Sequence, residues 1–252
     1  MLNMAKVRNR ANSTLGGDRQ FAATRWSMVV AAGHPSSPDS RHALESLCQT
    51  YWYPLYAYVR RLAPDVHEAQ DLTQAFFASL LEGNALEAAD RERGRFRSFL
   101  LTAFKHFLAD EWDKAKAKKR GVGRRSIPLN FESGESRLAQ EPMDEQSPER
   151  LYEKQWALTF LDHVLNRLGE EFAAKGKERQ FRAFKPFLAG ETEPNSYEVA
   201  ARALGITETA AKVAAHRLRR RYREVLRAEI AETVAGPQEV DDEIRQLRAA
   251  LG

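Results

Sequence analysis

Hydrophobic residues recur with a helical period along nearly the whole chain, and no convincing pair of strands can be found. A spacing of three and four residues places such side chains on one face of a helix. The most regular stripe predicts a helix from Phe96 to about Lys119, and its members are Phe96, Phe99, Leu100, Ala103, Phe104, Phe107 and Leu108. The pattern as a whole predicts an all-α protein.

The helices expected before residue 120 form one helical domain, which we assign to residues 18–120. They run from Phe21 to Ala32, from Ser40 to Leu62 and from Val66 to Leu81. Pro54 should kink or restart the second of them, because proline lacks the backbone N–H of a helix interior.

Glycines and prolines interrupt the helical pattern over residues 121–150, a stretch that is acidic from Glu132 onward. Such a composition predicts a flexible linker between two domains. A second helical domain is expected over residues 151–235, and a short acidic helix over residues 236–252. Further helices in the second domain are predicted at Leu151–Leu168 and Glu178–Leu188.

Residues 196–227 predict two helices around a tight turn. Asn195 and Glu198 have the spacing of a capping box, Gly205 suits a turn that needs positive φ, and Thr207 suits the next N-cap. Val199 and Ile206 are expected to face inward, as are Ala200, Ala203 and Leu204. The second helix should bury a stripe formed by Ala211, Ala215, Leu218, Tyr222 and Val225.

The opposite face of the second helix is suited to DNA. Between Lys212 and Arg227 the chain has seven Lys or Arg residues against one acid, Glu224. A helix-turn-helix places its second helix in the major groove, where short side chains meet base edges and cations meet phosphates. The alternative is an ordinary helical hairpin with a solvated basic face. The candidate DNA-binding residues are Thr209, Lys212, Val213, His216, Arg217 and Arg220.

Charge is distributed in blocks. Residues 62–90 contain six acids and no Lys or Arg, whereas residues 91–125 contain twelve Lys or Arg and four acids. Basic residues interleaved with aromatics suit single-stranded or melted nucleic acid. The alternative is that the aromatics are core residues, which leaves only Trp112 and His106 to stack or hydrogen-bond.

The helix at residues 66–81 has Leu72, Phe76 and Leu80 on one face. Asp71, Gln74 and Phe77 lie elsewhere, and an exposed Phe77 beside acids would indicate a protein partner. The alternative is that Phe77 packs against the preceding helix.

Several classes of protein are disfavoured. Cys48 is the only cysteine and lies in an apolar helical pattern, so we expect a buried thiol in a reducing cytoplasm. No apolar run approaches the length of a membrane span, and no secretory signal is evident. The sequence has no HExxH, CxxC or GxxxxGK[ST] motif, so we expect no catalytic activity, metal or cofactor.

Three segments together resemble an extracytoplasmic-function (ECF) sigma factor of bacterial RNA polymerase: DLTQAFFASLLE, RGRFRSFLLTAFKHFLADEWDKAKAKKR and SYEVAARALGITETAAKVAAHRLRRRYREVLR. Their order and spacing agree with that family over roughly residues 20–235. The resemblance implies a promoter-melting domain (region 2), a helix-turn-helix domain (region 4) and no catalytic site. It also implies that core RNA polymerase and promoter DNA are partners and that the free protein is a monomer. It leaves an anti-sigma factor open as a further partner.

Site residues follow from the resemblance by position. The polymerase-docking set is Asp71, Leu72, Gln74 and Phe77. The set for −10 recognition and melting is Arg95, Arg97, Lys105, His106, Trp112 and Lys116. The resemblance also implies that the second helix of the helix-turn-helix recognises the −35 element. The main alternative is an operator-binding helix-turn-helix regulator, which dimerises on palindromic DNA and needs no polymerase.

Overall fold

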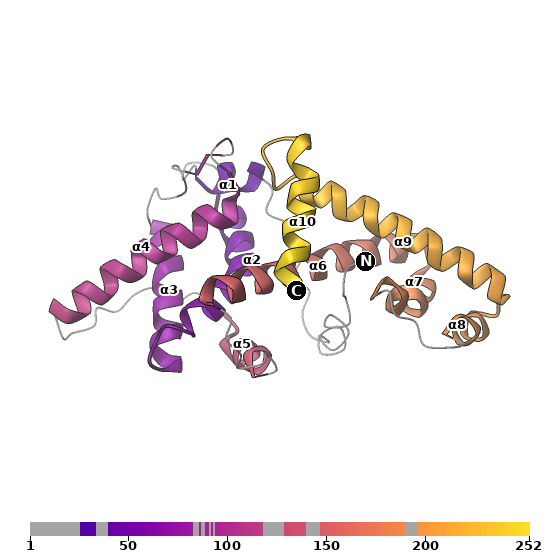
Figure 1. The fold of residues 1–252 in the computed structure, drawn as a ribbon, viewed down its shortest axis with the longest axis horizontal. Helices are drawn as coiled ribbons and strands as arrows, with labels where there is room; N and C mark the ends of the chain where they lie inside the picture. The colour runs from indigo at the N-terminus through magenta and orange to yellow at the C-terminus, as the bar shows by residue number, and fades with distance from the viewer. Residues whose placement is uncertain are drawn as a thin grey trace. The chain divides into compact units, whose positions relative to one another are not determined.

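A computed structural model describes most of the chain, and all regular elements in the described residues are helical. The prediction of an all-α fold is therefore confirmed. The chain divides into two compact units (Figure 1), which we treat separately. The first comprises residues 21–156 and 232–239, and the second includes residues 157–231 and 240–252. The described residues are 26–33, 40–82, 86, 89–90, 92, 94–117, 129–139, 147–189 and 196–252.

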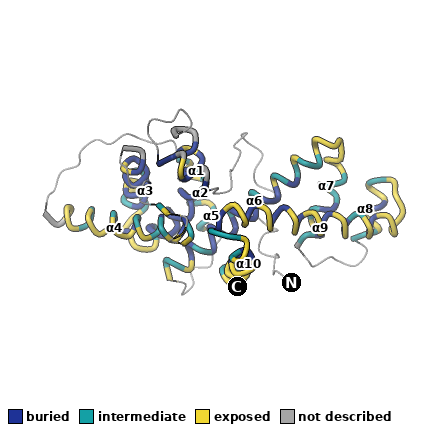
Figure 2. The backbone as a smooth tube through the Cα atoms, turned by 90° about the horizontal axis from the view of Figure 1, so that it is seen from above, coloured by how far each residue is buried: buried dark blue, intermediate teal, exposed yellow. Residues whose placement is uncertain are grey.

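The first unit is built from α1 (Trp26–Ala32), α2 (Ser40–Val59), α3 (Val66–Glu82), α4 (Phe96–Ala117), α5 (Phe131–Leu138) and the start of α6 (Pro148–Ala174). α2 continues through Pro54, so the helix does not restart there. Its second half is almost wholly buried (Figure 2), with Leu55, Tyr56 and Val59 at 0% exposure.

Aromatic rings join α4 to its neighbours. Phe104 lies 4.7 Å from Phe76 of α3 between ring centroids, and Phe96 lies 5.5 Å from Tyr51 of α2. Each such pair stabilises the fold by about 0.5–1.5 kcal/mol beyond the area it buries. The stripe predicted from the sequence thus forms the contact surface of α4.

α1 has a packing role in the first unit. The indole Nε1–H of Trp26 donates a hydrogen bond of 3.2 Å to the carbonyl oxygen of Thr233, and its ring meets Phe96 edge-on. Cys48 of α2 is buried, and burial raises the pKa of its thiol to about 12.

The predicted linker contains a helix that the sequence pattern did not indicate. The Phe131 ring of α5 packs against Trp52 and Tyr56 of α2, at centroid distances of 5.8 and 5.1 Å. The hydroxyl of Tyr56 donates to Glu135 at 2.5 Å. A single short apolar face was too little to reveal α5, and its stability comes from these contacts with α2. The boundary between the compact units falls within α6, after the predicted linker.

The second unit contains the remainder of α6, then α7 (Glu178–Phe184), a 3-10 turn η4 (Lys185–Ala189), α8 (Ser196–Leu204), α9 (Glu208–Ala231) and α10 (Val240–Leu251). α9 is tied to α6 through Glu229, a carboxylate only 1% exposed that pairs with His163 and Arg167. Arg227 pairs with Asp241 of α10 at 2.6 Å. Of these two carboxylates only Glu229 is buried, and burial of a carboxylate is costly unless it is paired as Glu229 is.

α8 and α9 form the predicted helix-turn-helix. Gly205 has φ of 66°, and the next backbone N–H, of Ile206, donates to the Ala201 carbonyl at 3.0 Å. The Thr207 hydroxyl accepts from the backbone N–H of Ala210 at 3.2 Å and caps α9. The predicted stripe of α9 is buried throughout. Asn195 lies outside the described residues.

Three apolar residues of this motif do not face inward as predicted. Val199 is 62% exposed and Ile206 is 38% exposed, and Ala203 is exposed too. The small residues Ala200 and Ala201 make the buried face of α8 instead. The close approach of α8 to α9 therefore depends on alanine methyl groups, which leaves the larger side chains outside.

Substitution of Gly205 should reveal its conformational role. A Cβ at this position would meet nothing within 4 Å, so Gly205→Ala tests backbone strain alone. We expect a loss of about 1 kcal/mol in the free energy of unfolding, because a left-handed conformation disfavours residues with a Cβ. Urea denaturation followed by circular dichroism measures this loss. Gly205→Asn, which tolerates that conformation better, should lose less, and equal stability of wild type and Gly205→Ala would contradict the argument.

Candidate nucleic-acid and polymerase interfaces

The outer face of α9 presents all six predicted DNA-binding residues to solvent. Thr209, His216 and Arg217 are exposed, and Val213 is 46% exposed. Lys212 pairs with Glu208 at 2.7 Å and Arg220 with Glu224 at 3.0 Å, one helical turn away in each case. Exposed pairs of this kind contribute little to stability, so both cations can exchange partners readily.

The arginines of α9 have two different environments. Arg219 turns inward, where its Nε donates to the Phe187 carbonyl at 3.0 Å and its Nη1 to the Tyr197 hydroxyl at 3.3 Å. Arg221 forms a two-pronged pair with Glu171 of α6 at 2.9 and 2.8 Å, and this bond holds the pKa of Glu171 below its usual range. These two arginines position α9 within the unit.

Other cations of α9 remain outside. Within the described part of the chain, no ion pair is found for Arg217 or Arg223. Arg223 follows His216 by seven residues, which places both on one face of the helix. Arg223 is not among the DNA-binding residues predicted from the sequence, although its helical spacing from His216 was a sufficient signal. The face formed by His216, Arg217, Arg220 and Arg223 is called the α9 basic face below.

On α4, the structure overturns one predicted DNA contact. Arg97 is 4% exposed, its Nε donates to Glu153 of α6 at 2.8 Å, and its guanidinium lies 4.1 Å from the Trp156 ring centroid. The Tyr152 hydroxyl donates to the carbonyl oxygen of Arg97 at 2.9 Å. Arg97 therefore joins α4 to α6 and does not lie on a surface open to DNA.

The rest of the α4 set is partly accessible. Lys105 and His106 are exposed, with Lys105 paired to Glu149 at 2.7 Å. Trp112 is half-buried, and its indole Nε1–H donates to Glu68 of α3 at 3.3 Å. Arg95 is half-buried just before the helix. Lys116 lies in α4, but its side chain falls outside the described residues.

The four predicted polymerase-docking residues of α3 differ in their exposure to solvent. Asp71 is exposed and Gln74 is half-buried. Leu72 and Phe77 are buried, at 8% and 1% exposure, and Phe77 packs against Phe76. The expectation of an exposed Phe77 is therefore wrong. Packing explains its position, and only Asp71 and Gln74 present polar groups to a partner from this set.

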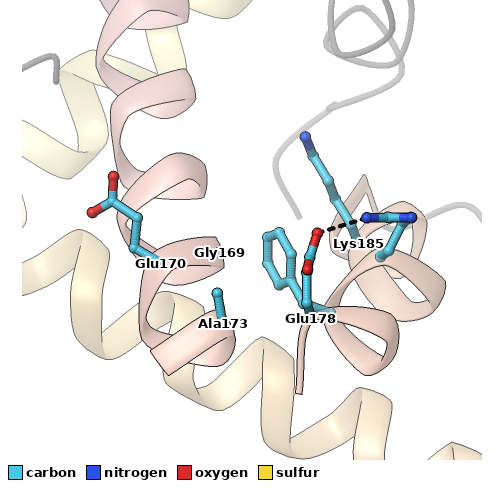
Figure 3. Close-up of a pocket in the computed structure, with 7 residues that line it drawn as sticks. Gly169, Glu170, Ala173, Glu178 and Lys185 are labelled. Carbon is cyan, nitrogen blue, oxygen red and sulfur yellow. Dashed lines mark hydrogen bonds and ion pairs between the residues drawn. The ribbon is translucent and has the colours of Figure 1, made fainter. Parts of the chain in front are cut away.

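The described residues offer little basis for other chemistry. Figure 3 shows a shallow hollow between α6 and α7, where Glu178 pairs with Arg182 and Glu170 points away from Glu178. No group of three or more potential metal-binding side chains occurs in the described ranges. None of the helices described has the length and apolar character that a membrane crossing requires.

A comparison with protein families finds a match for the segment that contains α3 and α4. Residues 47–118, less than a third of the chain, match the family described as Sigma-70 region 2. No curated protein and no solved structure matches the chain. A sigma-70 region 2 domain supports membership of the sigma factor family and a role in RNA polymerase binding and promoter melting.

The two classes of arginine should respond differently to substitution. Arg97→Ala removes a buried charge-assisted hydrogen bond and the contact with Trp156, so we expect a loss of about 2 kcal/mol in the free energy of unfolding. Arg217→Ala, on the α9 basic face, should change it by no more than about 0.5 kcal/mol. Chemical denaturation of the two variants in parallel measures both effects. Equal losses would show that Arg97 has no structural role beyond that of a surface cation.

Proposed function

We propose that this protein is an ECF-type sigma factor, which binds core RNA polymerase and directs it to promoters with specific −35 and −10 elements. The observation that carries the proposal is a sigma-70 region 2 domain in the same chain as a helix-turn-helix with an exposed basic face. Region 2 gives the link to polymerase, and α9 provides a second, separate means of reading duplex DNA. Neither feature requires a catalytic group.

In this proposal, α9 enters the major groove of the −35 element. Thr209 and Val213 lie on the exposed side of the N-terminal half of α9, where short side chains can approach base edges. The α9 basic face follows toward the C-terminus and contacts phosphates. Arg219 and Arg221 hold the helix in place, which is needed because a recognition helix must keep its register on the bases.

For region 2, we propose that Asp71 and Gln74 contact core polymerase and that Lys105 and His106 contact −10 DNA. Asp71 and His106 are exposed, and α3 and α4 are fixed to each other by the Phe76–Phe104 contact. Trp112 is secured by Glu68, so we assign it to the support of this surface. Leu72, Phe77 and Arg97 belong to the core beneath the surface.

An operator-binding regulator remains the alternative for the helix-turn-helix alone. It does not account for region 2, since a repressor has no need of polymerase. The test is reconstitution with bacterial core RNA polymerase, followed by run-off transcription on sheared genomic DNA. Stoichiometric binding and discrete transcripts support the proposal. Retention of specific duplex DNA without polymerase binding would favour the regulator.

Asp71→Ala should abolish or strongly weaken association with core polymerase, because it removes an exposed charge from the proposed docking face of α3. A pull-down with purified core enzyme measures this effect. The matched control is Glu45→Ala, which removes another exposed carboxylate of the same unit, on α2. Undiminished binding by Asp71→Ala would remove Asp71 from the docking surface.

Arg217→Ala should weaken binding to a mapped promoter and make that binding less dependent on salt. One lost phosphate contact lowers the slope of log affinity against log salt by about 0.9. Filter binding at several salt concentrations measures both quantities. An unchanged affinity and slope would place α9 away from the DNA backbone at Arg217.

A further inference from the structure

Lys105 of α4 is neutralised by a carboxylate from another helix. Its Nζ donates to Glu149 at 2.7 Å, and the two side chains are 41% and 45% exposed. The hydrogen bond raises the pKa of Lys105 and lowers the pKa of Glu149, so both groups are charged at neutral pH. Lys105, an exposed cation of α4, therefore has an internal anion beside it.

The position of Glu149 is fixed by its surroundings. It lies in the first turn of α6, where the Ser147 hydroxyl accepts from the backbone N–H of Arg150 at 3.3 Å. The ring of the buried Tyr58 on α2 lies beside the pair, with its centroid 5.7 Å from the Lys105 Nζ. The neighbouring Leu151 and Tyr152 are buried at 2% and 0% exposure, which anchors this turn. Because this turn is fixed, little conformational entropy is lost when Glu149 pairs with Lys105.

The two pairs between α4 and α6 differ in how readily they open. Arg97 is buried, pairs with the half-buried Glu153 and packs on Trp156, so movement of Arg97 away from Glu153 would disrupt the core. Lys105 and Glu149 form an exposed pair, and such pairs contribute little to stability. A phosphate can therefore replace Glu149 at Lys105 while the packing of α6 stays intact.

We propose that Glu149 is an internal competitor for DNA at Lys105: it occupies the place of a phosphate in the free protein and must be displaced when α4 binds DNA. This inference rests on the proposed DNA contact of α4. Such a competitor lowers the affinity of the free factor for nucleic acid in general. Binding that brings several contacts at once, as on a promoter with polymerase, is then favoured over isolated contacts with α4.

The experiment measures binding of the full chain to a labelled oligo(dT) single strand and to a random-sequence duplex at low salt. We expect Glu149→Gln to bind about two- to fivefold more tightly than wild type, the factor that corresponds to loss of a weak competing ion pair. Lys105→Ala should bind more weakly. The double variant should match Lys105→Ala, because the gain requires the lysine.

A charge-matched control separates pairing from net charge. Glu132→Gln removes an exposed carboxylate from α5 of the same unit and should leave affinity close to that of wild type. Circular dichroism of each variant verifies the helical fold. An unchanged affinity of Glu149→Gln, an equal gain in Glu132→Gln, or a gain that persists without Lys105 would each overturn the inference.

The same preparations distinguish this failure from failure of the proposed function. If Lys105→Ala binds both DNAs as wild type does, Lys105 is not a phosphate contact and the inference falls. Polymerase binding and discrete transcripts would then still support a sigma factor. If Glu149→Gln binds DNA more tightly in a Lys105-dependent way but the protein does not bind polymerase, the role of Glu149 as a competitor is supported and the sigma-factor proposal is overturned.

Discussion

The contact of the α4 stripe with α2 and α3 determines where each polar side chain of α4 lies. Phe96 and Phe104 are buried against Tyr51 and Phe76, so the rotation of the helix about its axis is fixed. Lys105 and His106 are turned to solvent as a result, and Arg97 is turned toward α6. The packing of α4 against α2 and α3 therefore fixes which of its side chains a polymerase or DNA partner can contact.

In the second unit, α9 likewise has one side that packs against neighbouring elements and one side that faces solvent. The alanine-lined side of α9 lies against α8, and Arg219 and Arg221 bind groups on η4, α8 and α6. Their neighbours Arg217 and Arg223 are left on the outside. A run of like charges therefore contains both structural and candidate binding residues. Its total charge overstates the number of phosphate contacts that α9 can make.

Helical periodicity was sufficient to predict the all-α fold, the stripe of α4 and the buried side of α9, because those features depend on residues close in sequence. It was insufficient where a distant segment decides the environment. Arg97 is covered by residues 153–156, and α5 is stabilised by ring contacts with α2 across almost eighty residues. Phe77 was misplaced because the main stripe of α3 suggested one buried face, whereas α3 is buried on a wider one.

Cys48 has a consequence for how this chain can respond to its surroundings. Oxidants such as peroxide react with the thiolate form of cysteine, and the raised pKa and burial of Cys48 keep it a thiol at physiological pH. It is the only cysteine of the chain. Oxidants that act on thiolates therefore have little access to this chain while α2 stays packed around Cys48.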